Sequence, residues 1–203
     1  METRTYADLY ELIEALCGVS FATLEQNRVK ALVNRRATRA YRASNYWPRY
    51  LVIGEERAVS SNIIPFTEGT LDEIDTFLRI HRTAPFSSGS AQEFDFMVTA
   101  SGAQLIAGTL DPSSAFVTYK SRHTATYGSG DSDTQTVPKE WFEYLAHGAY
   151  ADYLRAEGQQ EKSVIADAEA TDILTDELLR IDEQHTTQIV SQRIQTNANS
   201  QNR

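Results

Sequence analysis

The spacing of apolar residues changes twice along this chain, and no other feature constrains the fold as strongly. Apolar side chains recur at helical spacing from residue 5 to residue 44, and the same spacing returns after residue 137. Between these stretches the apolar residues form short runs or alternate with polar ones, and glycine or proline separates the runs. This order predicts an α+β protein in which an antiparallel β unit is inserted into a helical bundle.

Two helices are expected on each side of the β unit. The N-terminal pair ends before Pro48, because proline disfavours helical backbone at the residue that precedes it. The C-terminal pair begins near Pro138, a residue suited to the first turn of a helix, and its two helices are separated at Gly158. We therefore expect the helical bundle domain to comprise residues 1–49 and 137–183.

The rest of the chain is assigned by composition. Residues 50–136 are expected to form the inserted β domain. Residues 184–203 consist mostly of Gln, Thr, Asn and Ser, and are too polar to bury a core of their own. We expect an extended, polar C-terminal tail there, ordered when it lies along a partner.

Charge is distributed unevenly along the chain. The chain has 28 acidic and 19 basic residues and a formal net charge of -9, which argues against a surface adapted as a whole to duplex DNA. Residues 1–50 nevertheless hold eight basic and five acidic side chains, so the N-terminal helices are positive. Any contact with nucleic acid must therefore be local.

Four arginines form a basic stripe on the second predicted helix. Arg28, Arg35, Arg39 and Arg42 fall within about sixty degrees of one another at the helical repeat. Three interpretations are open. The arginines could pair with acidic residues of the last helix in the same or a neighbouring subunit, face the phosphates of a DNA channel without reading sequence, or form a solvated face.

The third predicted helix carries an aromatic surface wider than one helix partner can cover. Core packing is one interpretation, and a contact between subunits is the other, since Trp and Tyr supply large contact areas in interfaces. The residues concerned are Trp141, Phe142, Tyr144, Tyr150 and Tyr153.

No pattern in the sequence indicates catalysis. The four histidines lie far from any Cys or carboxylate at metal-ligand spacing, and no phosphate-binding or dinucleotide-binding glycine motif is present. Cys17 sits among apolar helical residues, where an inert thiol is expected. We predict that the protein is not an enzyme and uses no metal or cofactor.

Nothing in the sequence indicates a membrane. The first residues lack the pattern of a signal peptide, and no apolar run approaches the roughly 18 residues of a membrane span. We expect no membrane partner and assembly in a reducing cytoplasm.

The order of elements resembles that of the head-to-tail adaptors (connectors, or tail tubular adaptors) of tailed bacteriophages. The stretch VPKEWFEYLAHGAYADYL at residues 137–154, followed by GQQEK at 158–162, carries most of the likeness. As a succession of elements the likeness covers nearly the whole chain, and it contains no catalytic signature. The β unit is larger than in all-helical adaptors, which leaves its partner open.

The resemblance implies a structural protein of the virion, located in the neck between capsid and tail and assembled in the bacterial host cytoplasm. Such a protein forms a homo-oligomeric ring of about twelve copies that lines the DNA channel and serves genome ejection. Its partners would be the portal protein, a tail-side neck or tail tube/nozzle protein and, non-specifically, packaged DNA. The alternatives are another neck or tail protein such as a tail terminator, or a small DNA-binding regulator.

The resemblance also implies that the C-terminal tail reaches the portal. The portal-binding residues would be Gln188, Gln192, Arg193, Gln195, Asn197, Asn199, Gln201 and Arg203.

Overall fold

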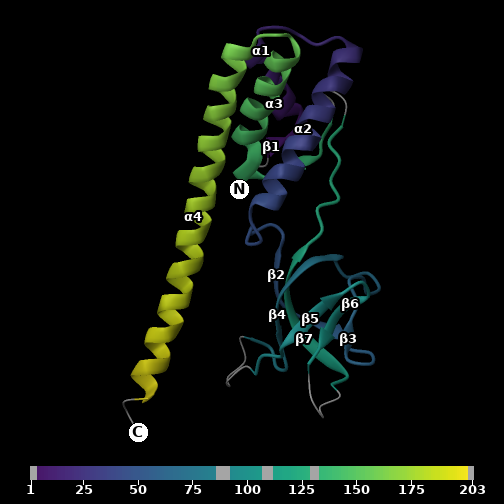
Figure 1. The fold of residues 1–203 in the computed structure, drawn as a ribbon, viewed down its shortest axis with the longest axis vertical. Helices are drawn as coiled ribbons and strands as arrows, with labels where there is room; N and C mark the ends of the chain where they lie inside the picture. The colour runs from purple at the N-terminus through teal and green to yellow at the C-terminus, as the bar shows by residue number, and fades with distance from the viewer. Residues whose placement is uncertain (1–3, 86–91, 107–111, 129–132, 201–203) are drawn as a thin grey trace. The chain divides into compact units, whose positions relative to one another are not determined.

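The computed structural model describes residues 4–85, 92–106, 112–128 and 133–200, and within residues 184–200 it describes the backbone alone. The chain forms two compact units (Figure 1). A helical unit comprises Met1–Ser44 and Ala125–Arg203, and a β unit comprises Asn45–Thr124. The predicted α+β class, with antiparallel sheets inserted between pairs of helices, is confirmed.

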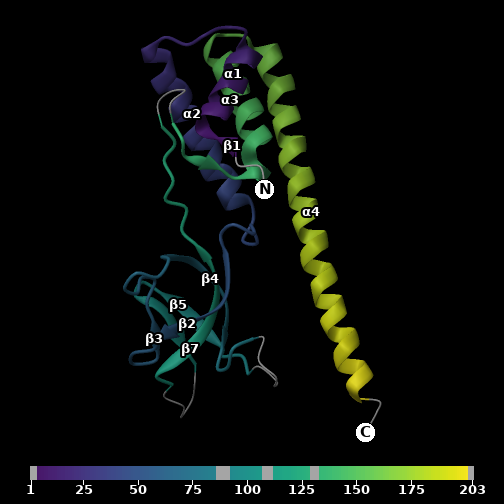
Figure 2. The same ribbon diagram turned by 180° about the vertical axis from the view of Figure 1, so that it is seen from behind.

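Four α-helices build the described part of the helical unit. They are α1 (Tyr6–Cys17), α2 (Thr23–Ala43), α3 (Phe142–Ala156) and α4 (Gln160–Ser200). The short 3-10 helix η1 (Lys139–Trp141) leads into α3. Helix α3 packs against the other three, and Figures 1 and 2 show it between α2 and α4.

Local chemistry fixes both ends of α1. The Thr5 hydroxyl accepts a hydrogen bond from the backbone N–H of Asp8, whose carboxylate in turn accepts one from the Thr5 N–H (2.7 Å), so two otherwise unpaired donors are satisfied. At the other end Gly18 adopts a φ of 69°, a left-handed conformation that favours glycine, and its N–H bonds the carbonyl of Glu14. These bonds explain why α1 starts and stops where it does.

Residues 125–137 belong to the helical unit, whereas the sequence predicts a β domain that extends to residue 136. The ring of Tyr127 stacks on that of Tyr6, with centroids 5.9 Å apart, and its N–H donates to the Asn34 side chain (2.9 Å). Strand β8 (Thr136–Val137) pairs with β1 (Arg4–Thr5) rather than with a sheet of the β unit. These contacts are made with residues distant in sequence, so the polar composition of the segment alone does not predict them.

Helix α4 continues further than expected. The sequence predicts an extended tail over residues 184–203, but the backbone is helical as far as Ser200. No glycine or proline occurs between Gln160 and Ser200, so nothing in the sequence stops a helix that has begun. Gln, which is frequent in this segment, is a good helix former.

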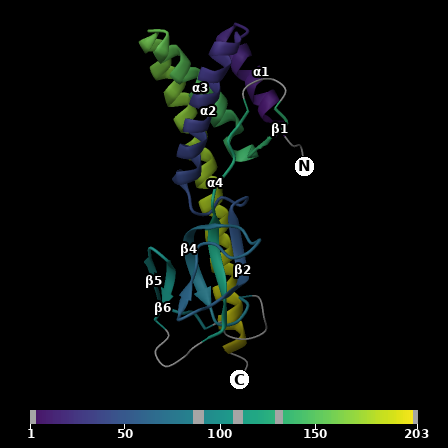
Figure 3. The same cartoon turned by 90° about the vertical axis from the view of Figure 1, so that its right-hand side faces the viewer.

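The described residues of the β unit form two three-stranded antiparallel sheets (Figure 3). The first has the order β2-β7-β4, formed by Leu51–Ala58, Ser114–Ser121 and Ile74–His81. The second has the order β3-β6-β5, formed by Ile63–Ile64, Gly102–Leu105 and Phe96–Thr99. Their buried side chains, among them Ile80 and Val117, form one core within this unit.

A charged network is buried in the same unit. Arg57 on β2 is fully buried, and its Nη2 donates to the Tyr119 hydroxyl and to the Asp72 carbonyl (2.6 Å). The Tyr119 hydroxyl donates to Glu55 (2.7 Å), which also forms an ion pair with Arg57. Burial and the bond to Glu55 raise the pKa of Tyr119 to about 12. The network joins β2 to β7 through Arg57 Nη2, whereas Nε and Nη1 of the same guanidinium have no hydrogen-bond partner in the described part of the chain.

Candidate interaction surfaces

The four arginines of the basic stripe are all exposed on α2. We call Arg28, Arg35, Arg39 and Arg42 the arginine face. The opposite side of α2 is apolar and buried in the helical unit, and it consists of Val29, Val33, Ala37 and Ala40. The helical repeat therefore separates a packed face from a charged face on one helix.

Half of the arginine face is paired within the same subunit. Arg28 Nη1 lies 3.1 Å from Glu157 Oε1, and Arg35 Nη2 lies 2.7 Å from Asp152 Oδ2. Both acids belong to α3 or its C-terminal end, and not to the acidic last helix. Arg39 and Arg42 form no ion pair with any residue that the structure describes. They remain available to a partner.

A fifth arginine, which the stripe does not include, is buried. Arg36 is 3 % exposed. Its Nε and Nη2 donate to the two carboxylate oxygens of Asp152 at 2.8 and 2.9 Å, and Nη2 also donates to Asp167 at 2.7 Å. Because Asp152 lies on α3 and Asp167 on α4, one guanidinium joins three helices.

Two further arginines complete this ionic cluster, which we define as Arg35, Arg36, Arg155, Asp152 and Asp167. Arg155 lies 3.2 Å from Asp152 and 3.4 Å from Asp167. Burial raises the pKa of Asp152, but the hydrogen bonds and charges of Arg36 and Arg35 outweigh burial and hold that pKa below its usual range. The pKa of Asp167 is lowered in the same way, by Arg36 and Arg155. Both carboxylates are therefore ionised at neutral pH.

A glycine makes room for the buried guanidinium. A Cβ on Gly148 of α3 would lie 3.0 Å from Arg36 Cδ, closer than ordinary van der Waals contact. Arg36 thus crosses α3 at the one turn where the helix has no side chain to displace it. A signal for this cluster exists in the sequence, because Arg36 falls at the edge of the apolar arc of α2, next to Val29, and Asp152 falls within that of α3.

The aromatic surface divides into core and partly exposed residues. Trp141, Phe142 and Tyr144 are buried within the helical unit, which places them in its core rather than at a contact between subunits. Tyr150 and Tyr153 are half-buried. The ring of Tyr153 packs edge-on against Phe21, with centroids 5.2 Å apart.

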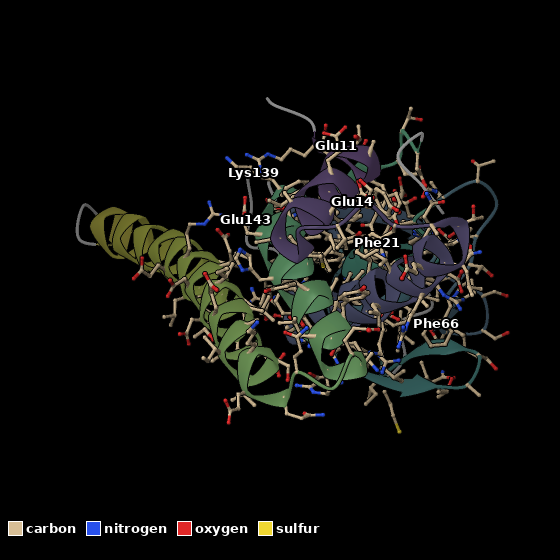
Figure 4. All side chains as sticks on the ribbon, turned by 90° about the horizontal axis from the view of Figure 1, so that it is seen from above. Glu11, Glu14, Phe21, Phe66, Lys139 and Glu143 are labelled. Atoms are coloured by element: carbon tan, nitrogen blue, oxygen red, sulfur yellow. The ribbon has the colours of Figure 1, made fainter. Side chains whose placement is uncertain are left out.

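The end of the bundle near Phe21 is fixed by a second contact. The backbone N–H of Phe21 donates to the Glu14 carboxylate at 2.7 Å, and both side chains are labelled in Figure 4. The loop between α1 and α2 is therefore held both by an aromatic ring and by a hydrogen bond. This anchoring sets the position of the first turn of α2 and, with it, of the arginine face.

The β unit has an exposed apolar edge. Met97 on β5 is 62 % exposed, and Val98 and Ile106 beside it are also exposed. Strand β5 ends its sheet, so its outer backbone groups face away from the β3-β6 pair. An apolar strand edge of this kind is suited to contact with another protein.

The remaining predicted residues are not brought into a site. The side chains of the tail residues Gln188, Gln192, Arg193, Gln195, Asn197 and Asn199 lie outside the described part of the chain, as do Gln201 and Arg203 altogether. Cys17 is half-buried, and burial together with Glu14 raises the pKa of its thiol to about 11. In the described ranges no group of three or more His, Cys, Asp or Glu side chains is placed to hold a metal ion.

Among the helices as far as they are described, none is long and apolar enough to cross a membrane. No protein-family model matches the chain, and no curated protein matches it significantly. The features that bear on function are therefore the order of the elements, the two charged helices of the helical unit and the apolar edge of the β unit.

Proposed function

We propose that this chain is a structural protein of a tailed-phage virion, an adaptor that forms a ring in the neck between the portal and the tail. The order of elements carries this proposal: two helices, an inserted antiparallel β unit, an aromatic helix opened by Pro138, and a long acidic helix. The resemblance to the adaptor family rests on this order.

The burial pattern supports a role in assembly rather than in chemistry. The charged residues that the helical unit buries, Arg36 and Asp152, neutralise each other and join helices. Arg39 and Arg42, which form no ion pair in the described part of the chain, lie on the surface, where another protein can reach them. A rigid bundle that presents charged outer faces is suited to a ring subunit.

Each part of the chain has a proposed contact. The helical unit builds the ring around the DNA path, and packaged DNA meets this ring through phosphate contacts that read no sequence. The exposed edge at Met97 and Val98 binds the tail-side neck or tail tube protein. Residues 184–203 reach the portal.

Cryo-electron microscopy of particles from the phage whose genome encodes this chain tests the proposal. We expect a ring of about twelve copies beneath the portal, with the end of α4 directed towards it. A ring at the far end of the tail tube would instead indicate a tail terminator. Absence of the chain from purified particles would overturn the proposal.

A further inference from the structure

Helix α4 has an apolar face that nothing in the described part of the chain covers. Its packed side is formed by Ala166, Ala170 and Ile181. On the opposite side lies what we call the outer face of α4, which consists of the exposed residues Val164, Ile165, Ala168, Thr171, Thr175 and Leu179. Ile165 is 70 % exposed. The steps of four, three and four residues from Val164 to Thr175 are those of a helix that packs against another helix.

The two threonines of this face are suited to a close approach. The Thr171 hydroxyl donates to the Asp167 carbonyl, and the Thr175 hydroxyl donates to the Thr171 carbonyl, each at 2.8 Å. Their hydrogen-bonding groups are therefore satisfied within α4, so an approaching helix need not supply partners for them.

Acidic side chains border the outer face. From Gln160 to Glu183, α4 has eight acidic and two basic residues. Asp167 belongs to the ionic cluster, and Glu177 pairs with Arg180. Glu161, Asp172, Asp176 and Asp182 form no ion pair in the described part of the chain. The outer face of α4 is thus apolar at its centre and negative at its margins.

The exposed side of α2 has the same spacing and the opposite charge. Leu24, Arg28, Ala31, Arg35, Thr38 and Arg42 are all exposed and follow one another in steps of four and three residues. Leu24, at one end of this series, is 84 % exposed. Helix α2 has six basic residues against one acidic residue, so this side is positive where the outer face of α4 is negative.

These two surfaces cannot meet within one subunit. Both helices pack against α3, which lies between them (Figures 1 and 2). The outer face of α4 is on the opposite side of the helix from its buried residues Ala166, Ala170 and Ile181. A second copy of the chain can bring its outer face of α4 to the arginine face of the first. DNA would match the arginine face alone and would leave the apolar, acidic face uncovered.

We propose that copies of this chain associate head to tail, with the arginine face of α2 in one copy packed against the outer face of α4 in the next. A row of copies joined in this way has a free arginine face at one end and a free outer face of α4 at the other. Further copies can therefore add until the two ends meet and the row closes into a ring. Single exposed ion pairs contribute little, but opposite charge along two whole faces selects the partner and its register. That the row closes into a ring rests on the proposed function. The inference adds the contact between subunits from which that ring is built.

Charge reversal on each face tests the contact with the full-length chain. Arg39→Glu/Arg42→Glu changes two exposed arginines, and Asp172→Lys/Asp176→Lys changes two exposed acids; none of the four forms an ion pair with a side chain that the structure describes. We expect each variant alone to self-associate at least tenfold more weakly than the wild type in sedimentation at low salt. An equimolar mixture of the two variants should regain association, because both charged faces of each variant are then opposite in sign to the facing surfaces of the other variant.

The matched control reverses two exposed arginines of the β unit, Arg49→Glu/Arg82→Glu, and changes the net charge by the same amount as the arginine-face variant. This control should associate like the wild type, and circular dichroism should show that all variants are folded. Three results would overturn the inference: a wild-type chain that stays monomeric at its highest soluble concentration, face variants that associate normally, or an arginine-face variant that loses only binding to a short DNA duplex.

The inference and the proposed function can fail separately. A ring in the virion neck that uses other surfaces would overturn the inference and leave the adaptor role standing. If the chain associates through these two faces but is absent from virions, the inference stands and the adaptor role is overturned.

Discussion

Arg36 connects three helices through two carboxylates. A buried charge is tolerated only when its partners are also present, because the cost of removing it from water is otherwise uncompensated. Here Asp152 occupies two guanidinium nitrogens and Asp167 shares one of them. The cluster therefore specifies how α2, α3 and α4 pack together, in addition to any stability that it contributes.

Replacing Arg36 should destabilise the helical unit strongly. In Arg36→Met the carboxylate of Asp152 stays buried and keeps only Arg35 and Arg155, so we expect a loss of about 3 kcal/mol in the free energy of unfolding. Urea unfolding followed by circular dichroism measures this loss. Arg39→Met, three residues along the same helix and exposed, should change it by less than about 0.5 kcal/mol. Equal effects of the two substitutions would show that the cluster is not a stabilising contact.

The same cluster should make stability depend on pH in the acidic range. The pKa values of Asp152 and Asp167 are lower in the folded chain than in the unfolded chain, where a carboxyl of this type titrates near about 3.9. Their contribution is present above the unfolded value and is lost as the pH falls through the folded values. We expect the free energy of unfolding to decrease from about pH 5 downwards. Asp152→Asn should show a shallower decrease, and an unchanged slope would exclude Asp152 as its source.

The elements differ in how far the sequence alone could predict them. The start and end of α1 follow from Thr5, Asp8 and Gly18, because capping is local chemistry. The assignment of residues 125–136 to the helical unit depends on Tyr127. Its partners Tyr6 and Asn34 lie about a hundred residues away in the sequence, so local sequence patterns cannot predict this assignment.

The candidate surfaces divide in the same way. The arginine face is predictable, since helical spacing alone places its four members together. The sequence favours a core position for Trp141 and Tyr144 over a subunit contact, but the choice between them depends on which helices surround these residues. Arg36 could have been found, because an arginine that borders the apolar arc of a helix is placed to be buried, and a buried guanidinium requires a carboxylate partner.

At the scale of the element, α4 should divide into a part that stabilises the bundle and a part that binds. Ile181 is the last buried residue of α4 whose side chain is described. Deleting residues 184–203 should therefore leave the melting temperature of the helical unit nearly unchanged and abolish attachment to portal rings in a co-sedimentation assay. Deleting residues 178–203 as a control also removes Ile181 and should lower the melting temperature. Undiminished attachment after the shorter deletion would refute the role of these residues in portal binding.

At the scale of the whole molecule, each unit has a core of its own. Ile80 and Val117 are buried within the β unit, whereas Leu145 and Val33 are buried within the helical unit. A cavity in one core should therefore loosen that unit first.

Hydrogen exchange measured by mass spectrometry can test this separation. Ile80→Ala removes fully buried methyl groups and should cost about 2–4 kcal/mol, with faster exchange in β4 and β7 and continued protection of α2 and α3. Leu145→Ala, the reciprocal variant, should speed exchange in the helices and leave the sheets protected. Uniformly faster exchange in either variant would show that the two units unfold together.

The β unit departs from the chain after α2 and rejoins it before α3, at Ser44/Asn45 and Thr124/Ala125. A gene with this layout has two natural crossover points, and recombination between them would exchange the middle of the protein without altering the buried faces of α1–α4. Under the proposed adaptor function, such an exchange would join a new tail-side contact to an unchanged ring, and we expect sequence divergence among homologues to be concentrated between these two junctions.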